Sequence, residues 1–326
     1  MSFKKILGQD KAVNTLKGFA ATGCVPQAMI FSGPQGCGKA TAALEFAKTL
    51  NCLDESCRIA QDNCSLCVNC KHIENGTHPD IILADFAYQA ALEKSDPEER
   101  QAILEKTQSI KIITTRALTA ASQQKVSFAK WKVFIIDRAE TMERGAANSI
   151  LKFIEEPPQN MVWILISCNK EKMYGTIRSR CQDIAFAPLT QDILLKILQD
   201  NFIESSIAKK AVKYAQGSST KALKAAEILT DIAALPDGAN FPTAFALNLP
   251  KTLALSRLQV SFALEMLSVS AYKVWTRESG KRKEDLQNLL SKLVFYKKAI
   301  TRNVSPSMVA EAALISAAAE GISLKD

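Results

Sequence analysis

The sequence predicts an α/β fold with a mostly parallel sheet, followed by a region built of helices. Short apolar runs alternate with helical patterns in the first part of the chain, and a glycine-rich loop follows the first of these runs. Strands that alternate with helices form parallel sheets covered on both faces. After Pro188 the strand signals fade and helical patterns dominate.

Four apolar runs are predicted to be strands, at residues 28–32, 80–85, 132–137 and 162–168. A helix is predicted from about Lys39 to Leu50, directly after the glycine loop. A second helix is predicted in GAANSILKFIEEPP, where apolar residues recur at spacings of three and four. Pro157 and Pro158 end it, because proline disfavours helical geometry in the residue before it.

The rest of the sequence predicts a surface excursion from the sheet domain, a linker and a soluble protein. Residues 86–108 are charged, contain Pro97 and are predicted to leave the sheet domain at the surface. Residues 235–242, LPDGANFP, are predicted to be a linker. No apolar run reaches the ~20 residues of a membrane span, so we expect a cytoplasmic protein without membrane contact. The net charge of +8 permits contact with nucleic acid but does not argue strongly for it.

The loop GPQGCGKAT is the first candidate site, because it nearly matches a phosphate-binding loop. Backbone N–H groups of such a loop bind phosphate oxygens, and Lys39 is expected to reach the outer phosphates. The next position normally holds a Ser or Thr that ligates magnesium, but here it is Ala40. Thr41 lies about 100° further round the helix. The predicted degenerate nucleotide site consists of Gly33, Gly36, Gly38, Lys39, Thr41 and Asp137.

Asp137 ends the third strand, where phosphate-loop enzymes hold magnesium, often through water. Many such enzymes follow this Asp with a Glu that activates the attacking water. Here the next residue is Arg138, and Glu140 is expected to point elsewhere. Since metal and water positioning supply much of the catalysis, we expect weak binding of ATP at most and no competent magnesium-dependent hydrolysis by this chain.

Five of the nine cysteines lie between residues 52 and 70, which favours a metal site over disulfides. Three of them form C-x2-C-x2-C, and Cys52 is the favoured fourth ligand, with Cys57 as a competitor and His72 or His78 as weaker ones. Four thiolates are typical of a closed structural zinc site, and an iron–sulfur cluster is the less favoured alternative. We therefore predict a zinc module at about residues 52–76, with ligands Cys52, Cys64, Cys67 and Cys70.

Arg180, in the segment TIRSRC, is the last candidate. A surface arginine paired with an acid is the more usual interpretation of such a residue. The other interpretation is that an arginine at this edge stabilises transition-state charge in the site of a neighbouring subunit.

The motifs together resemble the clamp-loader subunits of bacterial DNA polymerase III, in the AAA+ superfamily. The segments ILGQ, AMIFSGPQGCGK, the cysteine module, KVFIIDRAETM, AANSILKFIEEPP and IRSRC occur in the family's order. The resemblance is close over residues 1 to about 190 and looser beyond. It implies an AAA+ phosphate-loop domain over 1–189 with the zinc module, a helical lid over 190–234 and an all-α C-terminal collar over 235–326.

The family has a gamma/tau branch, which is the ATPase motor, and a delta-prime branch with degenerate nucleotide motifs. Ala40 and Arg138 are similar to the delta-prime pattern. This implies a stator that does not hydrolyse ATP and gives Arg180 to a neighbouring gamma/tau site as an arginine finger. The implied partners are gamma/tau and delta subunits in a hetero-pentamer, the sliding clamp, and primer–template DNA through the complex. Gln9 would lie near the adenine pocket of the motor branch.

Two other functions stay open at this point. The first is an active gamma/tau-like ATPase in which Thr41 or water covers for Ala40. The second, less favoured, is a zinc-bearing DNA-binding module with a vestigial nucleotide domain.

Overall fold

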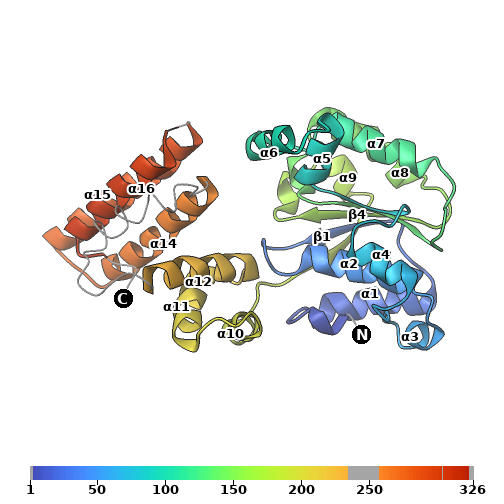
Figure 1. Ribbon diagram of the computed structural model, residues 1–326, viewed down its shortest axis with the longest axis horizontal. Helices are drawn as coiled ribbons and strands as arrows, with labels where there is room; N and C mark the ends of the chain where they lie inside the picture. Colours follow the sequence, from blue (N-terminus) through green and yellow to red (C-terminus); the bar gives the residue numbers. More distant parts are fainter. Residues whose placement is uncertain (1–2, 234–256, 303, 323–326) are drawn as a thin grey trace. The chain divides into compact units, whose positions relative to one another are not determined.

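The computed structural model describes residues 3–233, 257–302 and 304–322, and the chain divides after Leu189 into two compact units (Figure 1). The predicted linker at 235–242 lies outside the described residues.

The first unit contains a five-stranded parallel sheet in the order β2-β3-β4-β1-β5. The four predicted strands are confirmed and a fifth is added: β1 Ala28–Ser32, β2 Ile81–Ala84, β3 Lys132–Ile136, β4 Met161–Ser167 and β5 Gln182–Ala185. Every residue of β1, β3 and β4 is buried, which explains why these strands are continuous apolar runs in the sequence.

Strand β5 was not predicted, because its sequence QDIA buries only Ile184. It lies at the edge of the sheet and pairs with β1 alone. The buried Ser32 hydroxyl donates a hydrogen bond of 2.6 Å to Asp183 Oδ1 across this pair. A short polar edge strand carries no apolar signal, so the pattern that identified the other four is absent here.

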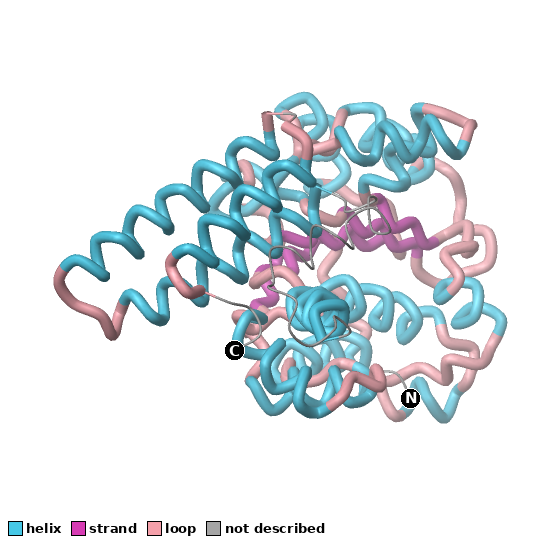
Figure 2. The backbone as a smooth tube through the Cα atoms, turned by 60° about the vertical axis from the view of Figure 1, so that its left-hand side comes forward, coloured by secondary structure: helices cyan, strands magenta, loops and turns pink. Residues whose placement is uncertain are grey.

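Helices cover both faces of this sheet (Figures 1 and 2). In chain order they are η1 Phe3–Lys5, α1 Asp10–Thr22, α2 Lys39–Asn51, α3 Glu55–Ile59, α4 Val68–Glu74, α5 Phe86–Glu93, α6 Pro97–Lys106, α7 Ile112–Ser122, η2 Ala139–Thr141, α8 Arg144–Glu155, η3 Lys170–Lys172 and α9 Gly175–Arg178. One core cluster joins the sheet to α1 and α2, and the other joins it to α7 and α8. On the second face, Trp163 of β4 stacks on Phe134 of β3 with 4.6 Å between ring centroids.

Proline has a different position in two predicted segments: it follows the end of one helix and lies in the first turn of another. The predicted helix before Pro157 is confirmed as α8, which ends at Glu155. The predicted excursion 86–108 forms α5 and α6, and Pro97 occupies the first turn of α6. Proline is favoured there because the N–H group that it lacks has no partner within a helix.

The second unit is helical throughout its described residues, as predicted. Its helices are α10 Gln191–Asp200, α11 Ser205–Ala215, α12 Ser219–Ala233, α14 Arg257–Trp275, α15 Lys281–Thr301 and α16 Pro306–Ala319. Helices α10 to α12 pack on one another, as do α14 to α16. The division into lid and collar at residue 235 stays a prediction. None of the helices in the described residues is both long enough and apolar enough to cross a membrane.

Candidate functional site

The glycine loop joins β1 to α2 and takes a backbone conformation that favours glycine. Gly33, Gly36 and Gly38 have φ angles of +148°, +72° and +96°. A Cβ atom on Gly33 would lie 2.3 Å from the carbonyl oxygen of Phe186. The loop therefore passes so close to the backbone beyond β5 that no side chain fits at residue 33.

Lys39 closes this loop on itself. Its ammonium group donates hydrogen bonds of 2.6 Å to the carbonyl oxygens of Gly33 and Pro34, and the residue is only 5% exposed. The Sγ atoms of Cys37 and Cys168 each lie 3.8 Å from the same nitrogen. The structure thus places the predicted phosphate-binding lysine inside the loop, on the loop's own carbonyl groups.

Ala40, the residue after Lys39, contributes to packing. Ala40 is half-buried and packs against the apolar core on the α1 and α2 face of the sheet. Thr41, the predicted substitute, has an exposed side chain. A methyl group supplies no oxygen to a cation, so the loop keeps the lysine of the pattern and lacks the hydroxyl that would ligate magnesium.

Asp137 directly follows β3 and is half-buried. Burial raises the pKa of its carboxyl group, and the Arg138 backbone N–H group and charge only partly oppose that rise. Arg138 has a φ angle of +53° and its guanidinium lies 5.0 Å from the centroid of the Phe86 ring. Arg138 is therefore held by an aromatic ring at the position where many phosphate-loop enzymes have a water-activating Glu.

Glu140 is a site residue that the sequence did not reveal, since it was expected to point elsewhere. Helix η2 turns it back, so that its Oε1 accepts a hydrogen bond of 3.2 Å from the backbone N–H of Cys168 at the end of β4. Its charge is close enough to Asp137 to help raise the pKa of that carboxyl group. No periodic signal marks a single 3-10 turn, so the sequence could not indicate this placement.

Gln9 ties the N-terminal segment to the loop. Its side-chain amide donates hydrogen bonds to the carbonyl oxygens of Ala187, at 2.7 Å, and Cys37, at 3.2 Å. Its side-chain oxygen accepts a bond of 2.9 Å from the backbone N–H of Ala187. This buried amide is fully used by the protein's own backbone.

Arg180 lies just beyond α9 at the surface, where its Nε is 2.6 Å from Glu155 Oε1 at the end of α8. Its Nη1 also donates a bond of 2.9 Å to the carbonyl oxygen of Thr176. Both charged side chains are more than 40% exposed. An exposed pair of this kind contributes at most about 1 kcal/mol, so Arg180 can exchange Glu155 for another anion at small cost.

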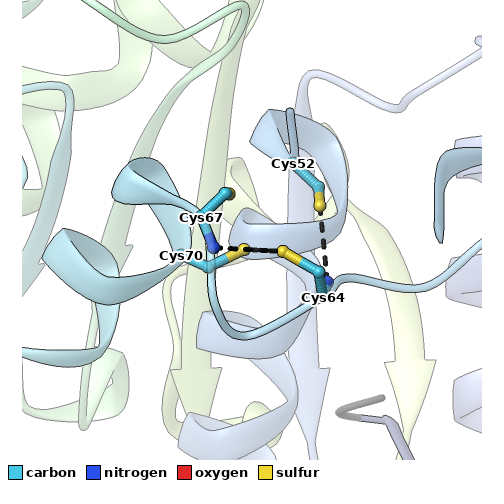
Figure 3. A group of neighbouring side chains, drawn as sticks. All are labelled: Cys52, Cys64, Cys67 and Cys70. Atoms are coloured by element: carbon cyan, nitrogen blue, oxygen red, sulfur yellow. Dashed lines mark hydrogen bonds between the residues drawn. The ribbon is translucent and has the colours of Figure 1, made fainter. Parts of the chain in front are cut away.

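The cysteine cluster is the second part of the site (Figure 3). The four Sγ atoms of Cys52, Cys64, Cys67 and Cys70 all lie within 4.8 Å of one another. Cys52 follows α2, Cys64 and Cys67 precede α4, and Cys70 lies on α4. Of the described residues, this group includes neither Cys57 nor the two histidines. The arrangement can hold a tetrahedral metal ion.

Backbone N–H groups prepare one of these thiols for a metal. Those of Leu66 and Cys67 donate to Cys64 Sγ over 3.4 and 3.2 Å. Burial by itself raises the pKa of the Cys64 thiol, but these N–H groups outweigh it and bring that pKa down to about 7. Burial raises the pKa of Cys70. Metal binding must therefore release protons from the cluster.

The known proteins to which this chain is similar include subunits of DNA polymerase III. The family described as "DNA polymerase III, delta subunit" matches residues 8–190, more than half of the chain. The gamma subunit of DNA polymerase III from Buchnera aphidicola subsp. Schizaphis graminum is 33% identical over 233 residues, which are 69% of this chain and 58% of that protein. The delta' subunit from Bacillus subtilis is 31% identical over 201 residues, 62% of this chain and 53% of that protein.

This chain therefore spans little more than half the length of these curated relatives. Among solved structures, a DNA polymerase III gamma-subunit-related protein from Thermotoga maritima is similar, with a TM-score of 0.56 and 14% identity. The match covers 95% of this chain and 99% of that chain. At this identity the likeness is one of fold.

Proposed function

The chain belongs to the DNA polymerase III delta subunit family, and from this membership we propose that it is a delta-prime-like stator of a clamp loader. It does not hydrolyse ATP by itself. It assembles with gamma/tau and delta subunits into a hetero-pentamer that places a sliding clamp on primer–template DNA. Its part is to supply a fixed partner surface and one arginine to a neighbouring ATPase.

The observation that carries this proposal is the state of the glycine loop. The residue after Lys39 is an alanine that packs against the core, so the magnesium ligand is missing. Lys39 occupies the loop from inside, and Asp137 is followed by an arginine held over Phe86. Phosphoryl transfer in phosphate-loop enzymes depends on a held metal and a positioned water, so we infer a binding loop without turnover.

Arg180 is the residue that we propose acts in trans, as an arginine finger. Its support is exposure, charge and a weak partner, because Glu155 is itself half-exposed. In the isolated chain Glu155 holds the guanidinium. In the assembled ring the phosphates of a neighbour's nucleotide replace Glu155, since charge developing on a transferred phosphoryl group is a stronger partner for arginine.

We also propose that the cysteine cluster binds zinc and that the ion is structural. Four thiolates leave no open coordination position for a substrate or water. The ion would join the end of α2 to the start of α4 and hold the module formed by α3 and α4. The nucleotide loop and the zinc ion thus have separate roles, one inherited from the fold and one stabilising it.

The experiment is a pair of ATPase assays with magnesium and primed DNA. The purified chain is expected to show no turnover above background, whereas a reconstituted loader turns over. In that loader, Arg180→Ala should reduce single-turnover hydrolysis at the adjacent site by about a thousandfold. Arg178→Ala is the matched control, because Arg178 is the last residue of α9, two positions before Arg180, and also pairs with a carboxylate, that of Glu171. If Arg180→Ala behaves like this control, the finger assignment is wrong.

The second candidate is an active gamma/tau-like ATPase, and the comparisons favour it in one respect. The Buchnera gamma subunit and the Bacillus tau subunit are 33% and 32% identical to the chain, against 31% for the Bacillus delta' subunit. Turnover by the chain alone that Lys39→Ala abolishes would establish this candidate and contradict the stator proposal.

A further inference from the structure

A groove beside the cysteine cluster takes no part in the function proposed above. It encloses about 730 Å³ within the first unit. Its walls are the C-terminal ends of α1 and α2, helix α3, and residues 128–131 before β3. A volume of this order matches pockets that bind small ligands.

The rim of the groove is apolar and exposed. Leu53, Ile59 and Phe128 line it with 64%, 78% and 76% of their surface accessible. Helix α3, which carries Ile59, buries no residue at all. One exposed apolar side chain is ordinary on a protein surface, but three around one groove mark a binding surface. The groove therefore favours a ligand that carries a bulky apolar group.

Phe128 lies on a loop that the protein holds firmly. The Asp80 carboxylate accepts hydrogen bonds of 2.8 to 3.1 Å from the backbone N–H groups of residues 127–129. The Asn51 amide bonds both the N–H group, at 2.8 Å, and the carbonyl oxygen, at 3.0 Å, of Trp131. Because the aromatic ring is presented by an ordered backbone, little further ordering of that backbone opposes binding.

The charge of the groove is positive. Arg58 and Lys130 line it, and neither lies within 4.0 Å of a carboxylate in the part of the chain that the structure describes. Glu55 is the one acidic residue among the lining residues, all of which are described, and it forms no ion pair with Arg58 although both lie on α3. The lining thus carries one more positive than negative side chain, which makes the groove complementary to the carboxylates of a ligand.

We propose that this groove binds a short acidic peptide segment of a partner protein, anchored by one bulky apolar side chain. The apolar side chain packs against Leu53, Ile59 and Phe128, and the carboxylates of the segment pair with Arg58 and Lys130. Aliphatic side chains form most of the rim, and two cations do not form a track along a phosphate backbone, so a peptide fits better than a nucleic acid. The site is independent of the proposed clamp-loading role.

The test uses the full chain and fluorescence anisotropy with four labelled probes. They are a peptide of alternating Asp and Phe, one of alternating Asp and Ala, one of alternating Lys and Phe, and an oligo(dT) strand. The Asp/Phe peptide is expected to bind with micromolar affinity. Each other probe is expected to bind at least about tenfold more weakly, since each lacks one of the two recognised features.

Variants locate the binding. Phe128→Ala and Lys130→Glu should each weaken the Asp/Phe peptide by about tenfold or more, and Glu55→Gln should leave it unchanged or tighter. Phe202→Ala is the control for an exposed aromatic ring, since Phe202 is 97% exposed in the second unit. Lys11→Glu, on the exposed face of α1, is the control for a change of charge. All of these altered side chains are exposed, so folding is expected to survive, as unfolding curves will check.

Three results would overturn the proposal. One is equal affinity for the Asp/Phe and Asp/Ala peptides, or for the Asp/Phe and Lys/Phe peptides. Another is binding that the Phe128 and Lys130 variants change no more than their controls do. The third is tighter binding of oligo(dT) that depends on the same two residues, which would make the groove a nucleic-acid surface.

Discussion

Gly33 is the residue whose identity the fold dictates most directly. Its φ angle is +148°, and a Cβ atom at this position would lie 2.3 Å from the Phe186 carbonyl oxygen. Any other amino acid would therefore require the backbone to move. The glycine at this point of the phosphate-loop pattern is required by packing between the loop and the segment after β5, whether or not nucleotide binds.

We predict that Gly33→Ala lowers the free energy of unfolding of the first unit by about 2 to 4 kcal/mol, through backbone strain and the contact with Phe186. Gly18→Ala is the control. Gly18 lies inside α1 with no atom near its missing side chain, so alanine should stabilise by about 0.5 to 1 kcal/mol. Urea unfolding followed by circular dichroism measures both, and equal effects would contradict the prediction.

Asp80 gives a prediction about pH. It is almost fully buried, and although burial favours the neutral form, three backbone N–H groups and Lys132 hold the pKa of its carboxyl group below the usual value. A carboxyl group whose folded-state pKa is lowered stabilises the fold above its unfolded-state pKa of about 4. This stabilisation is lost as the pH falls from about 4 through the folded-state pKa.

Asp80→Asn should therefore destabilise the protein by about 2 kcal/mol at pH 7 and flatten the acid limb of its stability profile below about pH 4. Denaturant unfolding at a series of pH values measures this. Asp192→Asn, on the exposed start of α10, should change stability by less than about 0.5 kcal/mol. An unchanged acid limb in Asp80→Asn would show that these contacts do not set the pH dependence.

At the scale of elements, α6 shows how a helix starts within a charged segment. The Asp96 side chain accepts a hydrogen bond of 3.0 Å from the Glu99 backbone N–H, and Pro97 follows it in the first turn. We predict that Asp96→Ala costs about 1 kcal/mol locally, which corresponds to about fivefold faster amide hydrogen exchange in that first turn. Asp96→Asn keeps the cap and should exchange like the wild type.

The elements also explain what the sequence could and could not reveal. Strands β1, β3 and β4 were predicted because burial on both faces makes each a continuous apolar run. The edge strand β2 is only partly buried, but its residues are also all apolar. Helix α8 was predicted from its period and its terminal prolines. Strand β5 buries one residue and left no such signal.

The candidate site also has parts that the sequence could reveal and parts that it could not. The glycine loop and the four cysteines are local patterns, so the sequence identified the residues that the structure brings together. The pairing of Arg180 with Glu155 and the bond from Cys168 to Glu140 join residues that are far apart in the chain. Such contacts depend on how α8, α9 and η2 pack, and spacing along one chain contains no record of that packing.

At the scale of the whole molecule, all four cysteines that we propose bind zinc lie in the first of two compact units. Calorimetry of the zinc-loaded chain is therefore expected to show two transitions. Chelation should lower one of them by about 5 °C or more, because metal binding is coupled to folding. Cys64→Ser should reproduce this shift and lose zinc, and Cys57→Ser should do neither. Movement of both transitions together would contradict the assignment.

Helix α2 connects the two parts of the site. It begins at Lys39 of the glycine loop, and Cys52 follows its last residue. The helix has thirteen residues and is about 20 Å long. Lys39 and Cys52 therefore lie at opposite ends of it. Because α2 is one continuous helix, a sideways displacement at its Cys52 end tilts its Lys39 end, so the position of the thiol cluster bears on the orientation of the loop.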